Sequence, residues 1–227
     1  MDISTLKNII LFEDLPDSAL EAISKLFKTN HYQKDNIILF EEDLGDLLFF
    51  IIEGEVKITR ANEMGREIIL SIIQKGDFFG EMSILDGESR SANAVTLSDA
   101  TIIIINRDDF YFILKKYPDV AIRLLKNLTQ RLRRADKLIE SLSLNDAEHR
   151  ICNTLFLIAE DAGIYKNKGV VISKLPNQDT LASMSGTSRE TVSRMFSKLK
   201  SKNLIQVEKH ELVILNYDNF ITEFIDK

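Results

Sequence analysis

Residues 178–200 have the sequence QDTLASMSGTSRETVSRMFSKLK, and this pattern sets the architecture of the C-terminal part of the chain. Gln178–Met184 has helical spacing, a short turn with Gly186 follows, and Arg189–Lys200 has helical spacing again. Two apolar runs come next, Leu204–Val207 and Leu212–Leu215, and they are typical of a strand hairpin. Two helices joined by a short turn and followed by a hairpin predict a winged helix-turn-helix.

The second of these helices has an apolar face and a polar face. The apolar face, expected in the core, carries Val192, Met195, Phe196 and Leu199. The polar face carries Arg189, Glu190, Ser193, Arg194, Ser197 and Lys200. Arginine can bond guanine bidentately and glutamate can accept from cytosine, so this face predicts contacts with bases in the major groove. The nearby lysines, Lys198, Lys200 and Lys202, are expected to contact phosphates.

A purely structural interpretation of the same residues stays open. Thr187-Ser-Arg-Glu190 fits a capping box, in which Glu190 would bond back to the start of the helix. Arg189 and Arg194 would then be ordinary solvated residues. The complete helix-turn-helix pattern favours DNA, because it lies within a segment from Lys174 to Lys209 that has 7 basic and 3 acidic residues.

The charge of the whole chain hides this local excess. The 227 residues have a formal charge of −6, which by itself argues against a nucleic-acid partner. Residues 1–117 contribute a net −9, residues 118–145 a net +3, and residues 146–227 a net of zero. This asymmetry indicates parts with different partners, and we predict an N-terminal domain over 1–117, a long helix and hinge over 118–145, and a DNA-binding domain over 146–227.

The N-terminal part has the pattern of a sheet. Six of the nine glycines lie between residues 45 and 87. Short runs rich in β-branched and aromatic residues alternate with them, at Ile37–Phe40, Leu47–Ile52, Val56–Thr59, Ile68–Ile73, Ala94–Thr96 and Thr101–Ile105. This spacing predicts an antiparallel sandwich or barrel, preceded by short helices between Leu6 and Phe27. The fold class is therefore α+β.

A long helix is predicted from Asp119 to about Asn145, where glycine and proline are absent. One seam at alternating 3- and 4-residue steps consists of Ile122, Leu125, Thr129, Leu132, Asp136 and Ile139. A second face carries Leu124, Leu128, Ala135, Leu138 and Leu142. Two apolar faces fit a helix that packs on its own domain and pairs with a second copy, making a homodimer. A single long core helix is the alternative.

Residues 76–96, GDFFGEMSILDGESRSANAVT, have the composition of a small-anion site. Gly80 allows close approach of the backbone, Arg90 offers a planar fork for phosphate oxygens and Ser91 a hydroxyl. Glu81 can accept from sugar hydroxyls. The alternative is a turn glycine and a surface Glu–Arg pair.

These residues also carry a family resemblance. Phe79-Gly-Glu-Met-Ser83 followed by Arg90-Ser-Ala92 resembles the phosphate-binding cassette of cyclic-nucleotide-binding β-rolls. With Ser188-Arg-Glu-Thr-Val-Ser-Arg194, the whole chain resembles the cyclic AMP receptor branch of the CRP/FNR regulators. The resemblance implies an N-terminal β-roll (a double-stranded β-helix or jelly roll), a long dimerisation helix and a C-terminal winged helix-turn-helix.

The resemblance also implies roles for single residues. Glu81 would hold the ribose 2′-hydroxyl, Arg90 and Ser91 the cyclic phosphate, and Gly80 would give a backbone contact. The other cassette positions implied to line the ligand are Met82, Ser83 and Ala92. The DNA contacts would come from Thr187, Ser188, Arg189, Glu190, Ser193, Arg194 and Lys200, on a palindrome with TGTGA-like half-sites. RNA polymerase is a further implied partner.

Three features depart from the family pattern. Glu42 stands where a glycine is usual, and the loop from Glu81 to Arg90 is one residue shorter. Ala135-Asp136 replaces the Thr-Ser pair that contacts adenine. Asp136 has three interpretations: a seam residue that fixes register, beside Arg133 and Arg134, an acceptor for adenine N6, or an acceptor for guanine N1 and N2. Cyclic AMP is the first choice of ligand and cyclic GMP the second.

Other chemistry finds little support in the sequence. His31, His149 and His210 are scattered, and Cys152 is the lone cysteine, so no metal site, haem, iron–sulfur cluster or catalytic residue is expected. After the β-roll the chain has too few residues for a typical enzyme domain, so we expect no enzyme activity. Without a signal peptide or a membrane-spanning run, the protein is expected in the cytoplasm, away from membranes. The competing function is a DNA-binding regulator whose β-roll binds no cyclic nucleotide, with constitutive DNA binding or another effector.

Overall fold

The computed structural model describes residues 2–65, 67–167, 169–208 and 211–225, so Lys209 and His210 lie outside the described residues. The chain forms two compact units, divided between Arg133 and Arg134. The N-terminal unit contains α1 (Ile3–Lys7), α2 (Asp17–Ser24), β1 (Lys28–Tyr32), β2 (Ile37–Leu39), β3 (Leu47–Glu53), β4 (Val56–Ala61), β5 (Glu67–Ile73), β6 (Phe78–Phe79), α3 (Glu81–Asp86), β7 (Asn93–Thr96), β8 (Ala100–Asn106) and α4 (Arg107–Lys116). Helix α5 (Pro118–Leu144) crosses the division.

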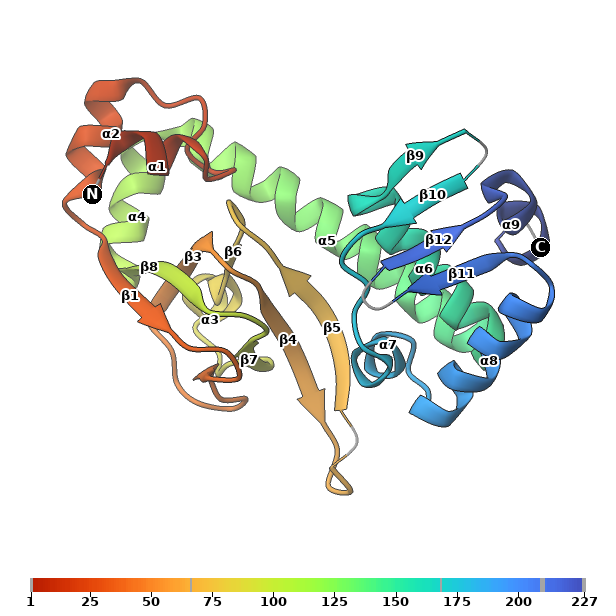
Figure 1. Ribbon diagram of the computed structural model, residues 1–227. Coiled ribbons are helices and arrows are strands. Elements are labelled where there is room, and N and C mark those ends of the chain that lie inside the picture. The colour runs from red at the N-terminus through yellow and green to blue at the C-terminus, as the bar shows by residue number, and fades with distance from the viewer. Residues whose placement is uncertain (1, 66, 168, 209–210, 226–227) are drawn as a thin grey trace. The chain divides into compact units, whose positions relative to one another are not determined.

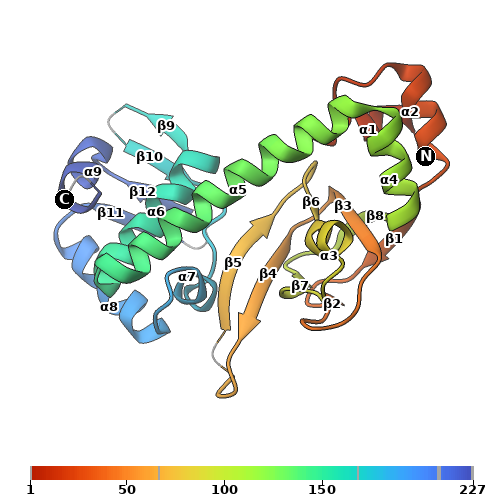
Figure 2. The same ribbon diagram turned by 180° about the vertical axis from the view of Figure 1, so that it is seen from behind.

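The C-terminal unit continues with α6 (Ala147–Ala162), β9 (Ile164–Lys166), β10 (Gly169–Ile172), α7 (Gln178–Met184), α8 (Arg189–Ser201), β11 (Ile205–Glu208), β12 (Glu211–Ile214) and α9 (Tyr217–Phe224). Figures 1 and 2 show these elements from opposite sides. Among the residues that the structure describes, no helix is both long and apolar enough to cross a bilayer.

The N-terminal unit is a β-roll of two antiparallel sheets, with strand orders β1-β8-β3-β6 and β2-β7-β4-β5. Strand β3 is buried on both faces. Phe49 and Ile51 belong to the cluster inside the roll, while Leu48 and Phe50 belong to a second cluster with residues of α1, α2, α4 and α5. A strand covered on both faces has a continuous apolar run, which explains the sequence LLFFII.

The predicted strands of this unit are confirmed, and the structure adds elements that were not predicted. Strand β1 has the polar sequence KTNHY and an exposed face, so it lacks the apolar signal, yet it pairs with β8 along its length. Strand β6 and helices α3 and α4 are further additions. In the C-terminal unit, β9 is a further addition, in which Ile164–Lys166 pairs with β10.

Helix α5 confirms the predicted helix, but its second face is buried only in the N-terminal half and is exposed at Ala135 and Leu142. Val120 and Leu124 are buried in the core of the N-terminal unit. The seam residues are exposed instead: Leu125, Leu132 and Ile139 keep more than 60% of their surface open. An exposed apolar stripe on a charged helix is the pattern of a helix that pairs with another helix.

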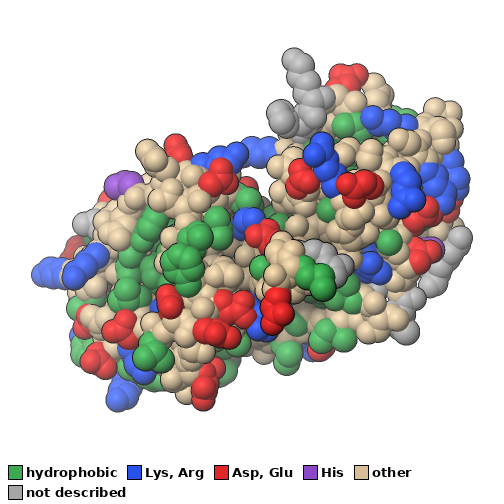
Figure 3. Space-filling model, turned by 90° about the horizontal axis from the view of Figure 1, so that it is seen from below, with side chains coloured by type: hydrophobic (Ala, Val, Ile, Leu, Met, Phe, Trp, Pro, Cys, Tyr) green, Lys and Arg blue, Asp and Glu red, His purple; other side chains and the backbone are tan. Residues whose placement is uncertain are grey.

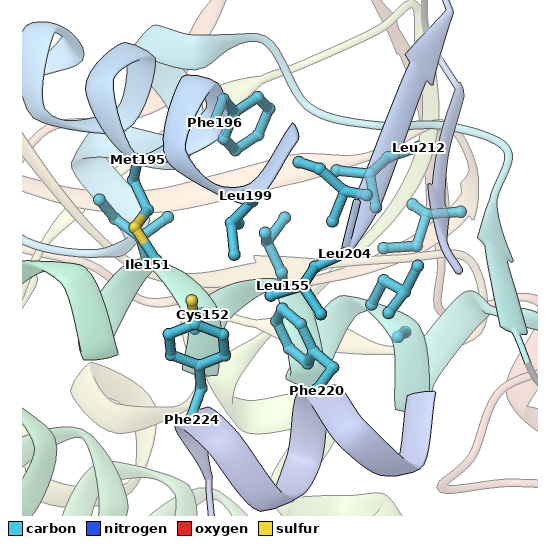
Figure 4. Packing of buried hydrophobic residues seen from close by; sticks show 14 of the residues in the cluster. Ile151, Cys152, Leu155, Met195, Phe196, Leu199, Leu204, Leu212, Phe220 and Phe224 are labelled. Carbon is cyan, nitrogen blue, oxygen red and sulfur yellow. The ribbon is translucent and has the colours of Figure 1, made fainter. Parts of the chain in front are cut away.

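The core of the C-terminal unit forms between α6, α8, α9 and the sheet β11-β12-β10-β9 (Figure 4). The predicted inner face of α8 is confirmed, because Val192, Met195, Phe196 and Leu199 are all buried. Cys152 lies on α6 against this core, and burial raises the pKa of its thiol to about 12. The thiol is therefore a packed apolar group.

Candidate functional site

The cassette residues form a short helix after a glycine turn. Strand β6 ends at Phe79, and Gly80 has a left-handed backbone with φ of +83°, where a side chain would be strained. Helix α3 starts directly at Glu81 and ends before Gly87. Met82 is exposed on this helix and Ser83 is buried. The sequence singled out Gly80 for close approach and missed the helix that it starts.

Arg90 lies beside Gly80, an arrangement that is needed if the two residues are to bind the same anion. The side chain is only 4% exposed, with Nη1 donating to Gly80 O at 2.8 Å and Nη2 to Leu47 O at 2.9 Å. Burial lowers the pKa of the guanidinium, and the carboxylates of Asp46 and Glu81 oppose this shift. A guanidinium has five N–H groups, so donors remain for an anion.

Ser91 and Ala92 follow Arg90 on the way into β7. Ser91 is exposed and its Oγ lies 3.5 Å from Met82 Sδ, so its hydroxyl stands next to the exposed side of α3. Ala92 is buried. The structure thus gathers Gly80, Arg90 and Ser91 around the start of one short helix.

Glu81 is buried at 5% exposure and has a charged partner that the sequence did not reveal. Arg131 Nη1 donates to Glu81 Oε1 at 3.1 Å, and Nη2 donates to Asp77 Oδ1 at 2.8 Å and to Phe78 O at 2.6 Å. The guanidinium also lies 4.5 Å from the ring centre of Phe78. Burial raises the pKa of Glu81, and the charge of Arg131 works against the rise.

Arg131 comes from α5, on the same face as Leu124 and Leu128. A basic residue at that spacing on the buried face was the signal that could have found it. Ala135 and Asp136 are exposed on the same helix and belong to the other compact unit. Their contact with a base stays a prediction.

Helix α8 begins one residue later than the capping-box interpretation requires. Ser188 is the cap, with an extended backbone and a side chain that accepts from Thr191 N at 3.3 Å. The Thr187 cap of the predicted box is therefore wrong, but Glu190 does bond back to the start of the helix, at Ser188. A bond from its own main chain and one from Ser188 lower the pKa of Glu190, so the carboxylate is charged at neutral pH.

The outer face of α8 is open. Arg189, Glu190, Ser193, Arg194 and Lys200 are exposed, and Thr187 is half-buried in the turn. Arg189 Nη1 lies 3.8 Å from Asp179 Oδ2, and Arg194 Nη2 donates to Thr191 Oγ1 at 3.2 Å. Lys198 and Lys202 form ion pairs with the carboxylates of Glu148 and Glu223, and their contact with phosphates stays a prediction.

Arg150 of α6 holds the turn between α7 and α8. Its Nε donates to Ser185 O at 2.9 Å, Nη2 to Gly186 O at 3.0 Å and Nη1 to Asn145 O at 2.9 Å. A buried bond of 2.9 Å between Thr154 Oγ1 and Ser185 Oγ lies beside it. Sequence reasoning missed Arg150, since two of its acceptors, the carbonyls of Ser185 and Gly186, lie 35 and 36 residues away along the chain.

The surface of the N-terminal unit has the charge that the sequence indicated. Asp and Glu side chains outnumber Lys and Arg over residues 1–117, at 21 against 12, and Figure 3 shows several of them gathered around the hydrophobic side chains on its visible face. Such a surface repels a polyanion.

Comparison with known proteins adds two family matches. Residues 29–117 match the cyclic nucleotide-binding domain, and residues 149–220 match the Crp-like helix-turn-helix domain. The chain is 30% identical over 203 residues to the cyclic AMP receptor protein of Thermus thermophilus, covering 89% of this chain and 90% of the relative. It is 28% identical over 204 residues to the CRP-like cAMP-activated global transcriptional regulator of Mycobacterium tuberculosis, covering 90% and 91%.

Solved structures give the same architecture. A mutant of CooA from Carboxydothermus hydrogenoformans matches with a TM-score of 0.80 and 23% identity, covering 89% of each chain. At that identity the likeness concerns the fold alone. The β-roll, the long helix and the helix-turn-helix are thus shared with proteins of this architecture.

Proposed function

The chain belongs to the CRP/FNR family of transcription regulators, and from this premise we propose that it is a homodimer whose DNA binding is gated by a cyclic nucleotide. Membership makes it a DNA-binding transcription regulator with a cyclic-nucleotide-binding domain, and none of the matched families is an enzyme family. The dimer, the identity of the ligand and the DNA half-site are the parts proposed here.

The observation that carries the ligand proposal is that the side chains of Arg90 and Glu81 are both buried beside Gly80, where α3 begins. A buried cation beside Gly80 suits a cyclic phosphate, and Ser91 adds a hydroxyl next to it. Glu81, one residue after Gly80, supplies an acceptor for the ribose 2′-hydroxyl, with Met82, Ser83 and Ala92 completing the wall. Arg131 would hold Glu81 in place.

Cyclic AMP is the first choice, which the names of the two relatives support. Asp136, with Ala135 before it, is the position that would contact the base. A carboxylate there can accept two donors from guanine N1 and N2, and this keeps cyclic GMP as the second choice.

The DNA proposal rests on the exposed first turn of α8. Arg189, Glu190 and Arg194 would contact the bases of a TGTGA-like half-site, while Ser193, Lys200, Thr187 and Ser188 would lie near the backbone. Two copies joined through the exposed seam of α5 would place two such helices on a palindrome. A regulator of this kind acts in the cytoplasm with RNA polymerase as a partner.

A second candidate function has an observation in its favour. Arg90 and Glu81 already have internal partners, and Ala135-Asp136 departs from the Thr-Ser pair of the family pattern. A β-roll stabilised by such internal bonds could bind no cyclic nucleotide, leaving DNA binding constitutive or set by another effector.

Two measurements separate the candidates. Calorimetry with cyclic AMP and cyclic GMP is expected to show binding of at least one, and binding of neither at millimolar concentration overturns the ligand proposal. A gel shift on a TGTGA palindrome is expected to need the nucleotide. Equal shifts with and without it favour the second candidate, and no shift on any palindrome contradicts the half-site.

A further inference from the structure

The guanidinium of Arg90 occupies a narrow slot between two backbone segments of the N-terminal unit. Its two terminal nitrogens donate to main-chain oxygens, Nη1 to Gly80 O before α3 and Nη2 to Leu47 O at the start of β3. Main-chain acceptors do not rotate as side chains do, so the course of these two segments fixes the direction in which the guanidinium points.

Glycines flank the slot on both sides. A side-chain carbon at Gly80 would lie 2.9 Å from Arg90 Nη1, and one at Gly45 would overlap with Arg90 Nε and Cζ. Gly80 needs glycine for its backbone as well, because φ is +83°. Gly45 has no such need, since its φ lies outside the left-handed region. The Arg90 side chain fills the space that a side chain at position 45 would need.

Hydrogen bonds on both sides anchor the loop that carries Gly45. The main chain of Arg90 bonds to it twice: Arg90 N donates to Asp43 O at 2.8 Å, and Glu42 N donates to Arg90 O at 2.9 Å. On the other side, Arg107 N donates to Asp46 O at 2.8 Å. Arg107 Nη2 also donates to Gly45 O at 3.3 Å and to Ser83 O at 2.7 Å, which joins the loop to α3.

A methyl group at position 45 therefore displaces the flexible end of Arg90 and leaves the backbone in place. We propose that Gly45 is a positioning residue of the anion site, whose missing side chain leaves the room in which Arg90 is held for the ligand phosphate. This rests on the proposed function in one respect, namely that Arg90 binds the phosphate of a cyclic nucleotide.

The test is Gly45→Ala in the full-length protein, with Leu44→Ala as the matched control because that neighbouring side chain is 90% exposed. Calorimetry with the nucleotide that the wild type binds is expected to show at least a tenfold loss for Gly45→Ala and less than a twofold change for Leu44→Ala. In an Arg90→Leu background, Gly45→Ala should cause no further loss, because the side chain it displaces is absent.

Thermal unfolding and an NMR measurement complete the test. Gly45→Ala should unfold cooperatively, at a temperature no lower than that of Arg90→Leu, because both changes take the donor from the Gly80 and Leu47 carbonyls. The Nε–H resonance of Arg90, assigned by its loss in Arg90→Leu, should shift and exchange faster. If the wild type binds no nucleotide, the proposed function fails, and this resonance alone decides the positioning role. Any one of three results overturns the proposal. These are wild-type affinity in Gly45→Ala, an unmoved Arg90 resonance, or a further loss in the Arg90→Leu background as large as the loss that Gly45→Ala causes in the otherwise wild-type protein.

Discussion

Arg90 in the β-roll and Arg189 in α8 are both expected to meet a phosphate-bearing partner, yet their surroundings are opposite. Arg90 is buried, with two main-chain oxygens as acceptors. The side chain of Arg189 is 63% exposed and has one distant carboxylate, that of Asp179, nearby. A small ligand must be held by an arginine that is oriented in advance, because few contacts are available. DNA offers many contacts, so its arginines can order on binding.

The largest expected effect comes from Arg90→Leu. The change removes a buried guanidinium and leaves the Gly80 and Leu47 oxygens without their donor, so nucleotide affinity should fall by about a hundredfold or more. Calorimetry measures the loss. Salt-sensitive nonspecific DNA binding, set by the other unit, should be unchanged. A variant that still responds to nucleotide shows that the phosphate is bound elsewhere.

Arg150→Leu tests whether the DNA-binding unit also depends on an arginine held by the backbone. Three carbonyls, those of Asn145, Ser185 and Gly186, lose their donor, so the turn before α8 should loosen. We expect about 2 kcal/mol less stability for this unit and roughly a thirtyfold loss of specific DNA affinity. Denaturant unfolding measures the stability of the unit, and fluorescence anisotropy measures the affinity for DNA. Lys166→Ala, which removes an exposed cation of the same unit, is the control and should change neither.

Arg189→Ala should have a smaller effect, because its partner Asp179, 3.8 Å away, is an exposed carboxylate that water can satisfy. Loss of one bidentate base contact is expected to cost about 1–2 kcal/mol, roughly a tenfold loss on the specific palindrome. Binding to a scrambled sequence should fall much less, and stability should not change. Equal losses on both sequences would show that Arg189 contacts phosphate and not a base.

The smallest effect concerns pH and Glu81. Burial raises the pKa of this carboxyl, so the folded protein binds its proton more readily than the unfolded chain does. The contribution of Glu81 to stability is therefore full below its unfolded pKa and is lost as pH rises through the folded pKa. Nucleotide binding needs the charged acceptor, so affinity should be a few-fold weaker at pH 5 than at pH 7. Glu81→Gln should bind weakly with no such pH dependence, measured by calorimetry at both values.

The sequence predicted those parts of the fold whose signal is local. Runs such as LLFFII and the i, i+3, i+4, i+7 spacing of Val192 to Leu199 depend on the residues themselves, and both were confirmed. Strand β1 was missed because its exposed KTNHY sequence lacks an apolar pattern and only pairing with β8 makes it a strand.

The supporting residues of the candidate site were missed for a different reason. Arg131, Arg150 and Gly45 act on groups far away in the sequence, and two of them bond to carbonyls, which every residue has. No residue type marks a carbonyl acceptor in advance. Residues that touch a ligand can be inferred from their chemistry, while those that hold them in place emerge only with the fold.

The pairing of Lys198 with Glu148 and of Lys202 with Glu223 affects how DNA binding should respond to salt. A cation that neutralises a phosphate displaces about 0.9 of a condensed counterion from duplex DNA. A lysine that is already bonded to a carboxylate must break that ion pair before it can bind a phosphate. The cost of breaking the pair offsets the free energy gained from the released counterion. The seven basic residues counted between Lys174 and Lys209 therefore overstate the number of ions set free, and affinity should vary less steeply with salt than that count implies.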